Sequence, residues 1–333
     1  MMTSDFTVTL HIGPIPEVDQ FFRMIVDMPN AARYFLLDVF TDSRYGGNQL
    51  AIFPEGQFVR KPLMARIAKE LQLSETVFVL PPSKREHHFK MRIFTPAMEL
   101  PTAGHPTIGT AFFMVRHIQF DDEANLLDLL IEQTAGTIRA CVKLREGAPV
   151  YSDMIMPKPS FVTTHDDRKA FAEMLGLKED ALEDELPIEV ISCGIPFTFI
   201  PIRSKSCVEK IQLDIAKWKA LKERLGVSFI YAFTRETSRP HSHVHGRMFA
   251  PEAGIMEDAA TGGANGPLGC YLYKHRLLPH HSDDLEIISE QGFEMGRPSI
   301  INIHIKGESG KISEVKIGGK CVLVGQGQIF LEE

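Results

Sequence analysis

The stretch Met91-Arg-Ile-Phe-Thr-Pro96 returns in altered form as Gly246-Arg-Met-Phe-Ala-Pro251, 155 residues further along the chain. Five other matches occur in the same order, at offsets that grow slowly from 147 to 158 residues. They pair Gly47–Pro54 with Gly194–Pro201, the helical pattern from Leu63 with that from Ile215, Ser74–Val79 with Ser228–Phe233, Gly104 with Gly262, and Glu132-Gln133 with Glu290-Gln291. Ordered self-similarity of this kind indicates an internal repeat. The chain is therefore predicted to contain two copies of one unit.

Within each copy, short apolar runs predict strands, and apolar residues at helical spacing predict a few helices. The predicted strands include Tyr34–Phe40, Gln49–Phe53, Thr76–Leu80 and His88–Phe94. The predicted helices are Pro62–Leu71, Pro106–His117, Asp167–Leu175, Ile215–Leu225 and Ala264–Arg276. Strands outnumber helices, and the regular alternation of a parallel sheet is missing. The predicted fold class is α+β.

Composition narrows the class of protein. The 333 residues have a formal charge of −7, with 44% hydrophobic and 24% charged residues, which is typical of a globular protein of about two domains. No apolar run approaches the ~18 residues of a membrane span, so no membrane partner is expected. An acidic balance without Lys/Arg blocks argues against binding nucleic acid. Five cysteines without a CxxC pair favour a reducing compartment, so we expect a cytoplasmic protein.

The repeat also suggests domain boundaries. Residues 1–33 are more acidic than basic and match neither a signal nor a transit peptide, so they are treated as an N-terminal extension of unknown role. The first repeat domain is predicted to comprise residues 34–150 together with a C-terminal strand at 320–333. The second is predicted to comprise residues 151–319.

Each copy has one Gly-rich turn that leads into a helix, at Ala103–Gly109 and at Thr261–Gly266. The backbone N–H groups of a first helical turn lack internal partners and carry partial positive charge. Two such ends in one cleft would bind an anion, so Gly104, Gly262 and Gly263 are candidate ligands for the carboxylate of a small molecule. The alternative is that these glycines only permit tight turns.

Three side chains near these turns are candidates for acid/base chemistry. Glu75 starts an apolar strand, where a buried carboxyl would have a raised pKa suited to proton transfer; an exposed strand-start residue is the alternative. His105, between Gly104 and Pro106, packs poorly into a core, which favours a cleft. Asp258 precedes the second helix, where capping the helix and acting in catalysis are both open.

Metal and thiol chemistry have weaker support. If His241, His243 and His245 lay on a strand, they would share one face of it. No further ligand stands at a compelling spacing, however, and a loop before the strand is favoured. No metal site is therefore predicted. The five cysteines lie outside both Gly-rich turns, so a thiol base is disfavoured; they are Cys141, Cys193, Cys207, Cys270 and Cys321. The glycines form no nucleotide-binding motif, and no cofactor is expected.

At these residues the sequence resembles the phenazine biosynthesis PhzF-like family, whose fold is similar to that of diaminopimelate epimerase. The resemblance extends from about Tyr34 to the carboxyl terminus. Its motifs are Asp38-Val-Phe-Thr-Asp with Gly47-Asn48, Leu73-Ser-Glu-Thr-Val-Phe-Val, Phe94-Thr-Pro, Glu99-Leu-Pro-Thr-Ala-Gly-His-Pro-Thr, Arg247-Met-Phe-Ala-Pro with Gly254-Ile-Met-Glu-Asp-Ala-Ala-Thr-Gly, and Glu290-Gln-Gly-Phe-Glu-Met-Gly-Arg-Pro-Ser.

The resemblance implies two facing pseudo-symmetric domains, each a β-barrel-like sheet around a central helix, and a homodimer. It implies cofactor-free acid/base chemistry, in the best understood case the isomerisation of trans-2,3-dihydro-3-hydroxyanthranilate by moving a hydrogen within the ring. The family's acidic shuttle falls on Glu75, and its cleft histidine and aspartate fall on His105 and Asp258. Asn48 joins the glycines as a candidate substrate-binding residue.

Three positions depart from the family pattern. Gly263 stands where a serine is common, Thr102 where an aromatic residue is common, and Gln49 where proline usually follows Gly-Asn. The missing hydroxyl at Gly263 bears on the substrate. The leading hypothesis is thus a PhzF-like isomerase of a small cyclic or amino-acid-like carboxylate. A non-catalytic binding or regulatory protein on the same scaffold is the alternative, and metal-dependent hydrolysis through the three histidines is a third possibility.

Overall fold

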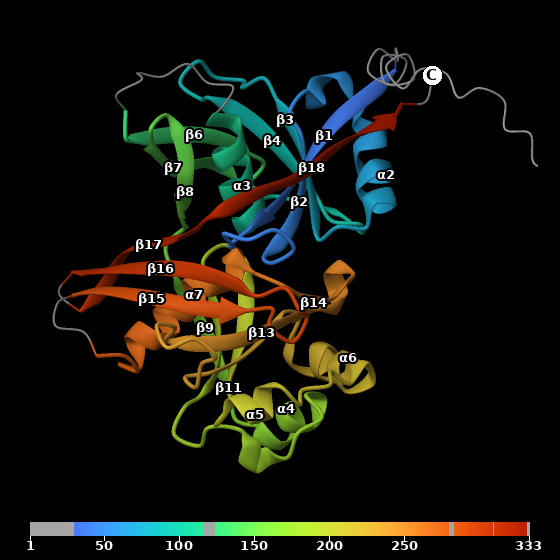
Figure 1. The fold of residues 1–333 in the computed structure, drawn as a ribbon. Coiled ribbons are helices and arrows are strands. Elements are labelled where there is room, and N and C mark those ends of the chain that lie inside the picture. Colours follow the sequence, from blue (N-terminus) through green and yellow to red (C-terminus); the bar gives the residue numbers. More distant parts are fainter. Residues whose placement is uncertain (1–29, 116–123, 280–282, 309, 332–333) are drawn as a thin grey trace, which may run out of the picture.

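The computed structural model describes residues 30–115, 124–279, 283–308 and 310–331 (Figure 1). Residues 1–29 of the predicted N-terminal extension and the end of the predicted helix Pro106–His117 lie outside the described residues. The rest of the chain forms two lobes of mixed α+β structure, one above the other in Figure 1.

The first lobe is a curved sheet around one buried helix. In order of pairing its strands are β18 (Cys321–Phe330), β1 (Ala31–Val39), β2 (Asn48–Phe53), β3 (Glu75–Leu80), β4 (Phe89–Phe94), β6 (Leu126–Gln133), β7 (Gly136–Arg145) and β8 (Ala148–Ile155), with β5 (Glu99–Leu100) beside β4. The central helix α3 (Gly104–Met114) is buried on all sides from Gly104 to Phe113, as expected of a helix that is apolar all round. The amphipathic helix α2 (Lys61–Leu71) covers the outside of the sheet.

The second lobe repeats this arrangement. Its strands, in pairing order, are β9 (Ser160–His165), β10 (Ile188–Ser192), β11 (Pro196–Pro201), β12 (Ile230–Thr234), β13 (Val244–Ala250), β15 (Asp284–Gln291), β16 (Ser299–Glu308) and β17 (Lys311–Gly319), with β14 (Ile255–Asp258) beside β13. The central helix is α7 (Gly262–Lys274), and the outer helices are α4 (Arg168–Met174), α5 (Lys205–Val208) and α6 (Ile215–Leu225). Single 3₁₀ turns lie at Gly56–Phe58, Glu179–Ala181 and Pro251–Ala253.

The repeat predicted from the offsets is visible in the strand pairing and in the side chains. In both lobes the connection between two parallel strands is helical, with α2 between β2 and β3 and with α5 and α6 between β11 and β12. Arg92 holds Glu99 through two hydrogen bonds of 2.7 Å. Arg247, 155 residues later, holds Glu257 through bonds of 2.8 and 2.7 Å. Equivalent strands therefore carry equivalent ion pairs.

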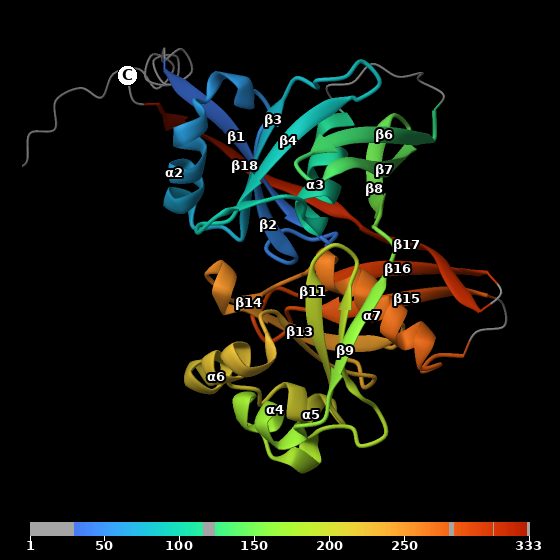
Figure 2. The same cartoon turned by 180° about the vertical axis from the view of Figure 1, so that it is seen from behind.

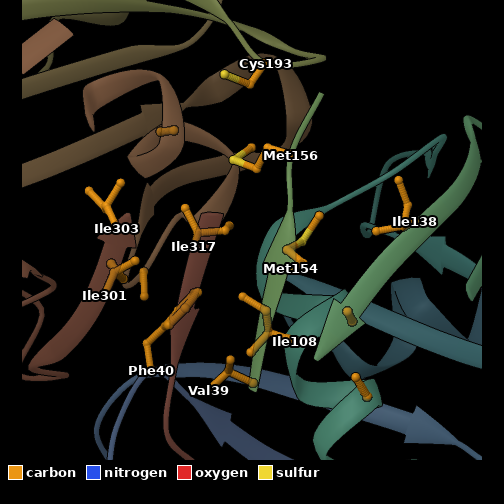
Figure 3. Close-up of a cluster of buried hydrophobic side chains, with 14 of the residues drawn as sticks. Val39, Phe40, Ile108, Ile138, Met154, Met156, Cys193, Ile301, Ile303 and Ile317 are labelled. Atoms are coloured by element: carbon orange, nitrogen blue, oxygen red, sulfur yellow. The ribbon is translucent and has the colours of Figure 1, made fainter. Parts of the chain in front are cut away.

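The chain crosses twice between the lobes at their junction. The chain leaves the first sheet at β8 and enters the second at β9, and it returns from β17 to β18 (Figures 1 and 2). β8 and β17 pair antiparallel from Ser152↔Gly319 to Ile155↔Lys316, which joins the two sheets. One apolar cluster spans this junction, with Val39 and Ile108 from one lobe near Ile301 and Ile317 from the other (Figure 3). The exact domain boundaries predicted above stay a prediction.

The predicted helix starts shift slightly. α6 has the predicted bounds, whereas α7 starts at Gly262 rather than Ala264 and α3 starts at Gly104. Pro106 is thus inside the first turn of α3, where its missing N–H removes no helical hydrogen bond. Consequently His105 belongs to α3 instead of preceding it.

The first turns of α3 and α7 meet backbone to backbone. A methyl group added at Gly104 would lie 2.7 Å from the nitrogen of Gly263 and 2.8 Å from Gly262. Such a contact is too short for any real Cβ atom, so an alanine would force the two helices apart. The glycine at position 104 is required by this approach.

Gly104→Ala is expected to lower the free energy of unfolding by about 1–3 kcal/mol, the usual cost of overpacking, as measured by urea titration. Gly325→Ala is the matched control, because an added methyl there has no heavy atom within 4 Å, and its effect should stay within about 0.5 kcal/mol. Equal stability of the two variants would contradict the close approach of the helices.

Candidate active site

A small cavity of about 70 Å³ lies between the lobes, beside the meeting point of α3 and α7. Its wall is mostly apolar and includes Leu100, Phe197, Phe229 and Met248. The polar side chains on it are Glu75, Thr95, His105, Asp258 and Thr261, and no lysine or arginine is among the described residues that line it. A larger hollow of about 520 Å³ on the outer face of β7, β8, β16 and β17 holds none of the predicted site residues.

Glu75 is the first residue of β3 and is only 8% exposed. Its Oε2 atom lies 3.2 Å from Nε2 of His105, yet the two are not aligned as a hydrogen bond, and neither atom has a hydrogen-bond partner among the described residues. Burial, together with the nearby charge of Asp258, raises the pKa of Glu75 well above its usual 4.5. A raised pKa makes a carboxylate a stronger base, which suits it to proton transfer.

His105 is buried and neutral. Burial lowers the pKa of His105 to about 3, against a smaller opposing effect of a hydrogen bond to the Gln49 backbone. Nδ1 of His105 lies 3.3 Å from Nδ2 of Asn48, whereas Nε2 has no hydrogen-bond partner among the described residues. Nε2 is the ring nitrogen that faces Glu75.

Asp258, at the end of β14, is 5% exposed and surrounded by hydrogen-bond donors. Its Oδ1 accepts from Asn48 Nδ2 at 2.7 Å and from Ser74 Oγ at 3.3 Å, and its Oδ2 accepts from Thr261 Oγ1 at 2.6 Å. The pKa of Asp258 is raised, because the effect of burial outweighs that of these bonds, which lower it. Asp258 is not the cap of α7, because Thr261 occupies the N-cap position.

Asn48 joins the two lobes at this point. Its Nδ2 donates to Asp258 and, at 2.9 Å, to the carbonyl of Ala260, and it lies 3.3 Å from Nδ1 of His105. Its Oδ1 accepts from Ser74 Oγ at 3.1 Å. Both amide hydrogens thus face oxygen acceptors of the second lobe, which fixes the orientation of the amide.

The helix starts form the remaining wall. Neither α3 nor α7 has a side-chain cap, so the N–H groups of their first turns stay available to a ligand. Gly104, Gly262 and Gly263 all line the cavity. A methyl group added at Gly263 would meet only the Phe197 ring, at 3.7–3.8 Å, an ordinary contact, so the position has room for a small side chain.

All seven candidate residues from the sequence therefore lie together around one cavity or in direct contact with its lining. Sequence reasoning assigned no role to Ser74 or Thr261, although both stand inside quoted motifs, next to Glu75 and Gly262. It also missed the aromatic wall, where the rings of Phe197 and Phe229 lie 5.6 Å apart. Nothing in the local patterns distinguishes those two phenylalanines from core residues.

The comparisons with known proteins agree with this geometry. A family model described as "Phenazine biosynthesis-like protein" matches residues 37–327. The chain belongs to this family. It is 33% identical over 302 residues to the trans-2,3-dihydro-3-hydroxyanthranilate isomerase of Pseudomonas aeruginosa, covering 90% of this chain and 99% of that one. Relatives carry the name isomerase, and the chain is an isomerase.

Solved structures show the same fold. A PhzF family protein of Bacillus anthracis superposes with a TM-score of 0.81 at 25% identity, covering 91% of this chain and all of the other. A hydroxyproline epimerase from Agrobacterium vitis, only 11% identical, has a TM-score of 0.62 over 91% of this chain and 94% of its own. The predicted α+β, epimerase-like class of this phenazine biosynthesis-like protein is confirmed.

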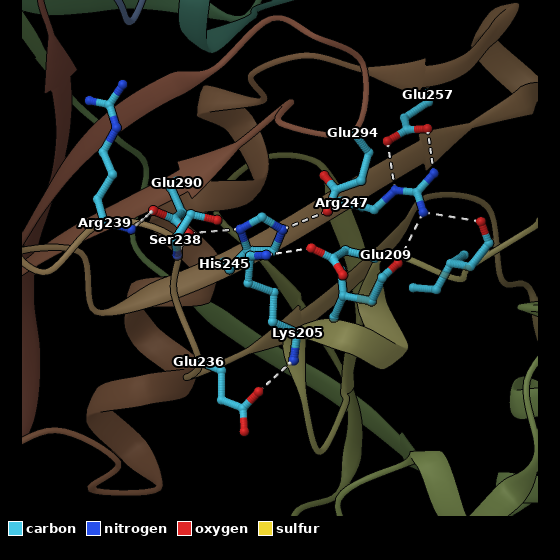
Figure 4. A network of polar contacts seen from close by, with 12 residues as sticks. Lys205, Glu209, Glu236, Ser238, Arg239, His245, Arg247, Glu257, Glu290 and Glu294 are labelled. Carbon is cyan, nitrogen blue, oxygen red and sulfur yellow. Dashed lines mark hydrogen bonds and ion pairs between the residues drawn. The ribbon is translucent and has the colours of Figure 1, made fainter.

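The histidines considered for a metal site do not lie on one strand face. β13 begins at Val244, so His241 and His243 precede it. His245 is fully buried, with Nδ1 2.8 Å from Glu290 and Nε2 2.8 Å from Glu294 (Figure 4). Burial lowers the pKa of His245, but its bonds to the two carboxylates outweigh this and raise it to about 9. A metal ion would have to displace both carboxylates from the ring.

Among the residues that the structure describes, no group of three His, Cys, Asp or Glu side chains could hold a metal ion. The five cysteines are free, and none lines the cavity. No helix in the described part of the chain is long and apolar enough to cross a membrane.

Glu75→Gln should stabilise the protein increasingly as the pH rises above 4.5. The pKa of Glu75 is higher in the folded than in the unfolded chain. Wild-type stability therefore falls as the pH rises from the usual 4.5 of the unfolded chain to the raised pKa of the folded chain. A glutamine does not ionise and avoids this loss. Urea titrations between about pH 5 and pH 8 measure the difference. The exposed Glu70→Gln is the control; the same pH dependence in wild type and Glu75→Gln would contradict the raised pKa.

Proposed function

We propose that this phenazine biosynthesis-like protein is a cofactor-independent isomerase that moves a hydrogen between two carbon atoms of a small cyclic or amino-acid-like carboxylate. One observation carries the proposal. Oε2 of Glu75 and Nε2 of His105 lie 3.2 Å apart without hydrogen-bond partners in the described chain, on the wall of a cavity that two uncapped helix starts also line. Buried polar atoms without partners are rare, and here they face the space a substrate would fill.

The residues that line the cavity favour a substrate that carries both a carboxylate and a hydrogen-bond donor. In the absence of a lysine or arginine among the described lining residues, the N–H groups at Gly104, Gly262 and Gly263 would bind the carboxylate. An amino or hydroxyl group would donate to Asp258, and Nε2 of His105 faces the same space. The rings of Phe197 and Phe229 would pack against the apolar part of the molecule.

The proposed reaction needs no second reactant, because the proton that leaves one carbon is returned to another. The Glu75 carboxylate removes a proton from one carbon, and the electron pair of the broken C–H bond enters the conjugated system of the substrate. The Glu75 carboxylic acid then returns the proton to another carbon of the same system. Acid/base catalysis of this kind contributes about 10²–10⁴-fold in rate.

The size of the site bears on how the substrate enters. The cavity of about 70 Å³ is smaller than the roughly 150 Å³ cavity that holds a benzene molecule. Because the wall comes from both lobes, a small opening between them would admit a six-membered ring, and closure would then exclude water. The room beside Gly263 would accept a substituent on the ring.

The first test is turnover of trans-2,3-dihydro-3-hydroxyanthranilate in D₂O, followed by NMR. Wild type is expected to convert it, and Glu75→Gln to convert it about 10²–10⁴-fold more slowly while still binding it. Glu70→Gln serves as the exposed-carboxyl control. Equal turnover by wild type and Glu75→Gln would overturn the role of Glu75, and binding without turnover or hydrogen exchange by either would favour a binding protein. If wild type neither binds nor converts it, other small amino carboxylates are the next substrates to test.

The pH profile tests the charges around Glu75. kcat/KM should fall as the pH falls through the pKa of Glu75, at a pH well above 4.5, because the carboxylate is the base. Asp258→Asn removes a negative charge that raises this pKa, so the acid limb should move to lower pH. The distant Asp153→Asn is the control. A limb that stays in place, or moves to higher pH, in Asp258→Asn would contradict the assigned coupling.

We retain the homodimer and the cytoplasmic location as predictions from the sequence. The small-molecule carboxylate is the partner for which the site offers specific contacts.

A further inference from the structure

The loop Gly292–Pro298 between β15 and β16 sends one side chain into the other lobe. Arg297 Nη2 donates to Asp38 Oδ1 and to the Gly46 carbonyl, each at 2.6 Å, and Nε donates to the Gly47 carbonyl at 2.8 Å. A guanidinium holds several acceptors at once because its donors form a rigid planar fork. One side chain of the second lobe therefore binds three acceptors of the first.

These acceptors belong to the segment that leads directly into Asn48. The Asp38 side chain is only 2% exposed, and its second oxygen accepts from the Tyr45 N–H at 2.6 Å. Tyr45 and Gly47 have φ angles of 71° and 62°, and a left-handed tyrosine is a strained conformation that persists only where neighbours hold it. Arg297 bonds to the carbonyls of Gly46 and Gly47 in this turn and to the Asp38 side chain that accepts from Tyr45.

This loop and the two strand residues that flank it also hold the backbone around Asp258. A methyl group added at Gly292 would lie 2.4 Å from the Ala259 carbonyl oxygen. Ser299 Oγ donates to that carbonyl at 2.9 Å, and Gln291 Nε2 donates to the Asp258 carbonyl at 2.7 Å. Glu294 anchors the loop within its own lobe through His245 (Figure 4). The loop and its flanking residues Gln291 and Ser299 thus contact the backbone both next to Asn48 and at Asp258.

We propose that Arg297 is a positioning residue that sets the Asn48 amide against Asp258 and His105 across the two lobes. The hydrogen bonds concerned stand without a substrate; only the effect on turnover rests on the proposed function. If the turn before Asn48 relaxes, Asp258 Oδ1 keeps only the 3.3 Å bond from Ser74. The amide that lies next to His105 and Asp258, the two titratable groups that face Glu75, would then be displaced.

The test is the side-chain amide signal of Asn48 in ¹H–¹⁵N NMR spectra of the ligand-free protein, assigned with Asn48→Asp. In Arg297→Lys the two amide hydrogens should shift and exchange with solvent at least about tenfold faster than in wild type, because a local opening exposes them. Asp38→Asn, which leaves the arginine in place, should show the same change and serves if Arg297→Lys does not fold.

Arg168→Lys is the matched control. The Arg168 side chain has the same 21% exposure and donates to the carbonyls of Leu186 and Glu183 at 3.1 and 2.7 Å, beside Asp184, but none of these residues lines the cavity. The Asn48 signal should be unchanged in this variant. An unchanged Asn48 signal in Arg297→Lys and Asp38→Asn, or an equal change in Arg168→Lys, would overturn the proposal.

Turnover provides the second measurement. Where wild type converts a substrate, Arg297→Lys should lower kcat/KM by about 10- to 100-fold, the scale of a small misplacement in an active site, and Arg168→Lys should not. If wild type shows no turnover, the amide signal still decides the role of Arg297, so failure of the proposed reaction and failure of this inference remain distinct. If Arg297→Lys changed the Asn48 amide signal strongly but kept full activity, Arg297 would have only a structural role. That result would contradict its role in positioning the reacting groups.

Discussion

Backbone-to-backbone contact between the first turns of two buried helices determines the rest of this structure. A side chain at Gly104 would collide with Gly262 and Gly263, so only glycine permits the approach. The contact brings two sets of unpaired N–H groups to one cavity, with the same sign of partial charge. An anion between them would offset that repulsion, which is a reason to propose a substrate that carries a carboxylate.

The two carboxyl groups of the site are buried in opposite ways. Asp258 accepts hydrogen bonds from Asn48, Ser74 and Thr261, which stabilise its charged form. Glu75 Oε2 has no such partner in the described chain, and the charge of Asp258 raises its pKa further. Burial raises the pKa of both carboxyl groups, but only at Asp258 do hydrogen bonds oppose the rise. The difference in hydrogen bonding therefore makes Glu75 the better candidate for proton transfer.

Local patterns predict much of this. The ordered offsets predict two equivalent units, and motif spacing groups Glu75, His105 and Asp258 as candidates. What the sequence does not show are the contacts between distant segments. Arg297 meets Asp38 across 259 positions, and no local pattern specifies such a pairing. For the same reason the sequence leaves open whether Asp258 caps a helix. In the folded chain Thr261 is the N-cap residue of α7, and its Oγ1 donates a hydrogen bond to Asp258.

The titration of Glu75 tests most directly whether this buried carboxyl group has the raised pKa that proton transfer needs. The ¹³C carboxyl signal of Glu75 in the ligand-free protein, assigned with Glu75→Gln, can be followed against pH without any substrate. We expect a midpoint well above the usual 4.5. A midpoint at or below that value would contradict it, because such a carboxyl group would be a weak base in an ordinary solvated environment.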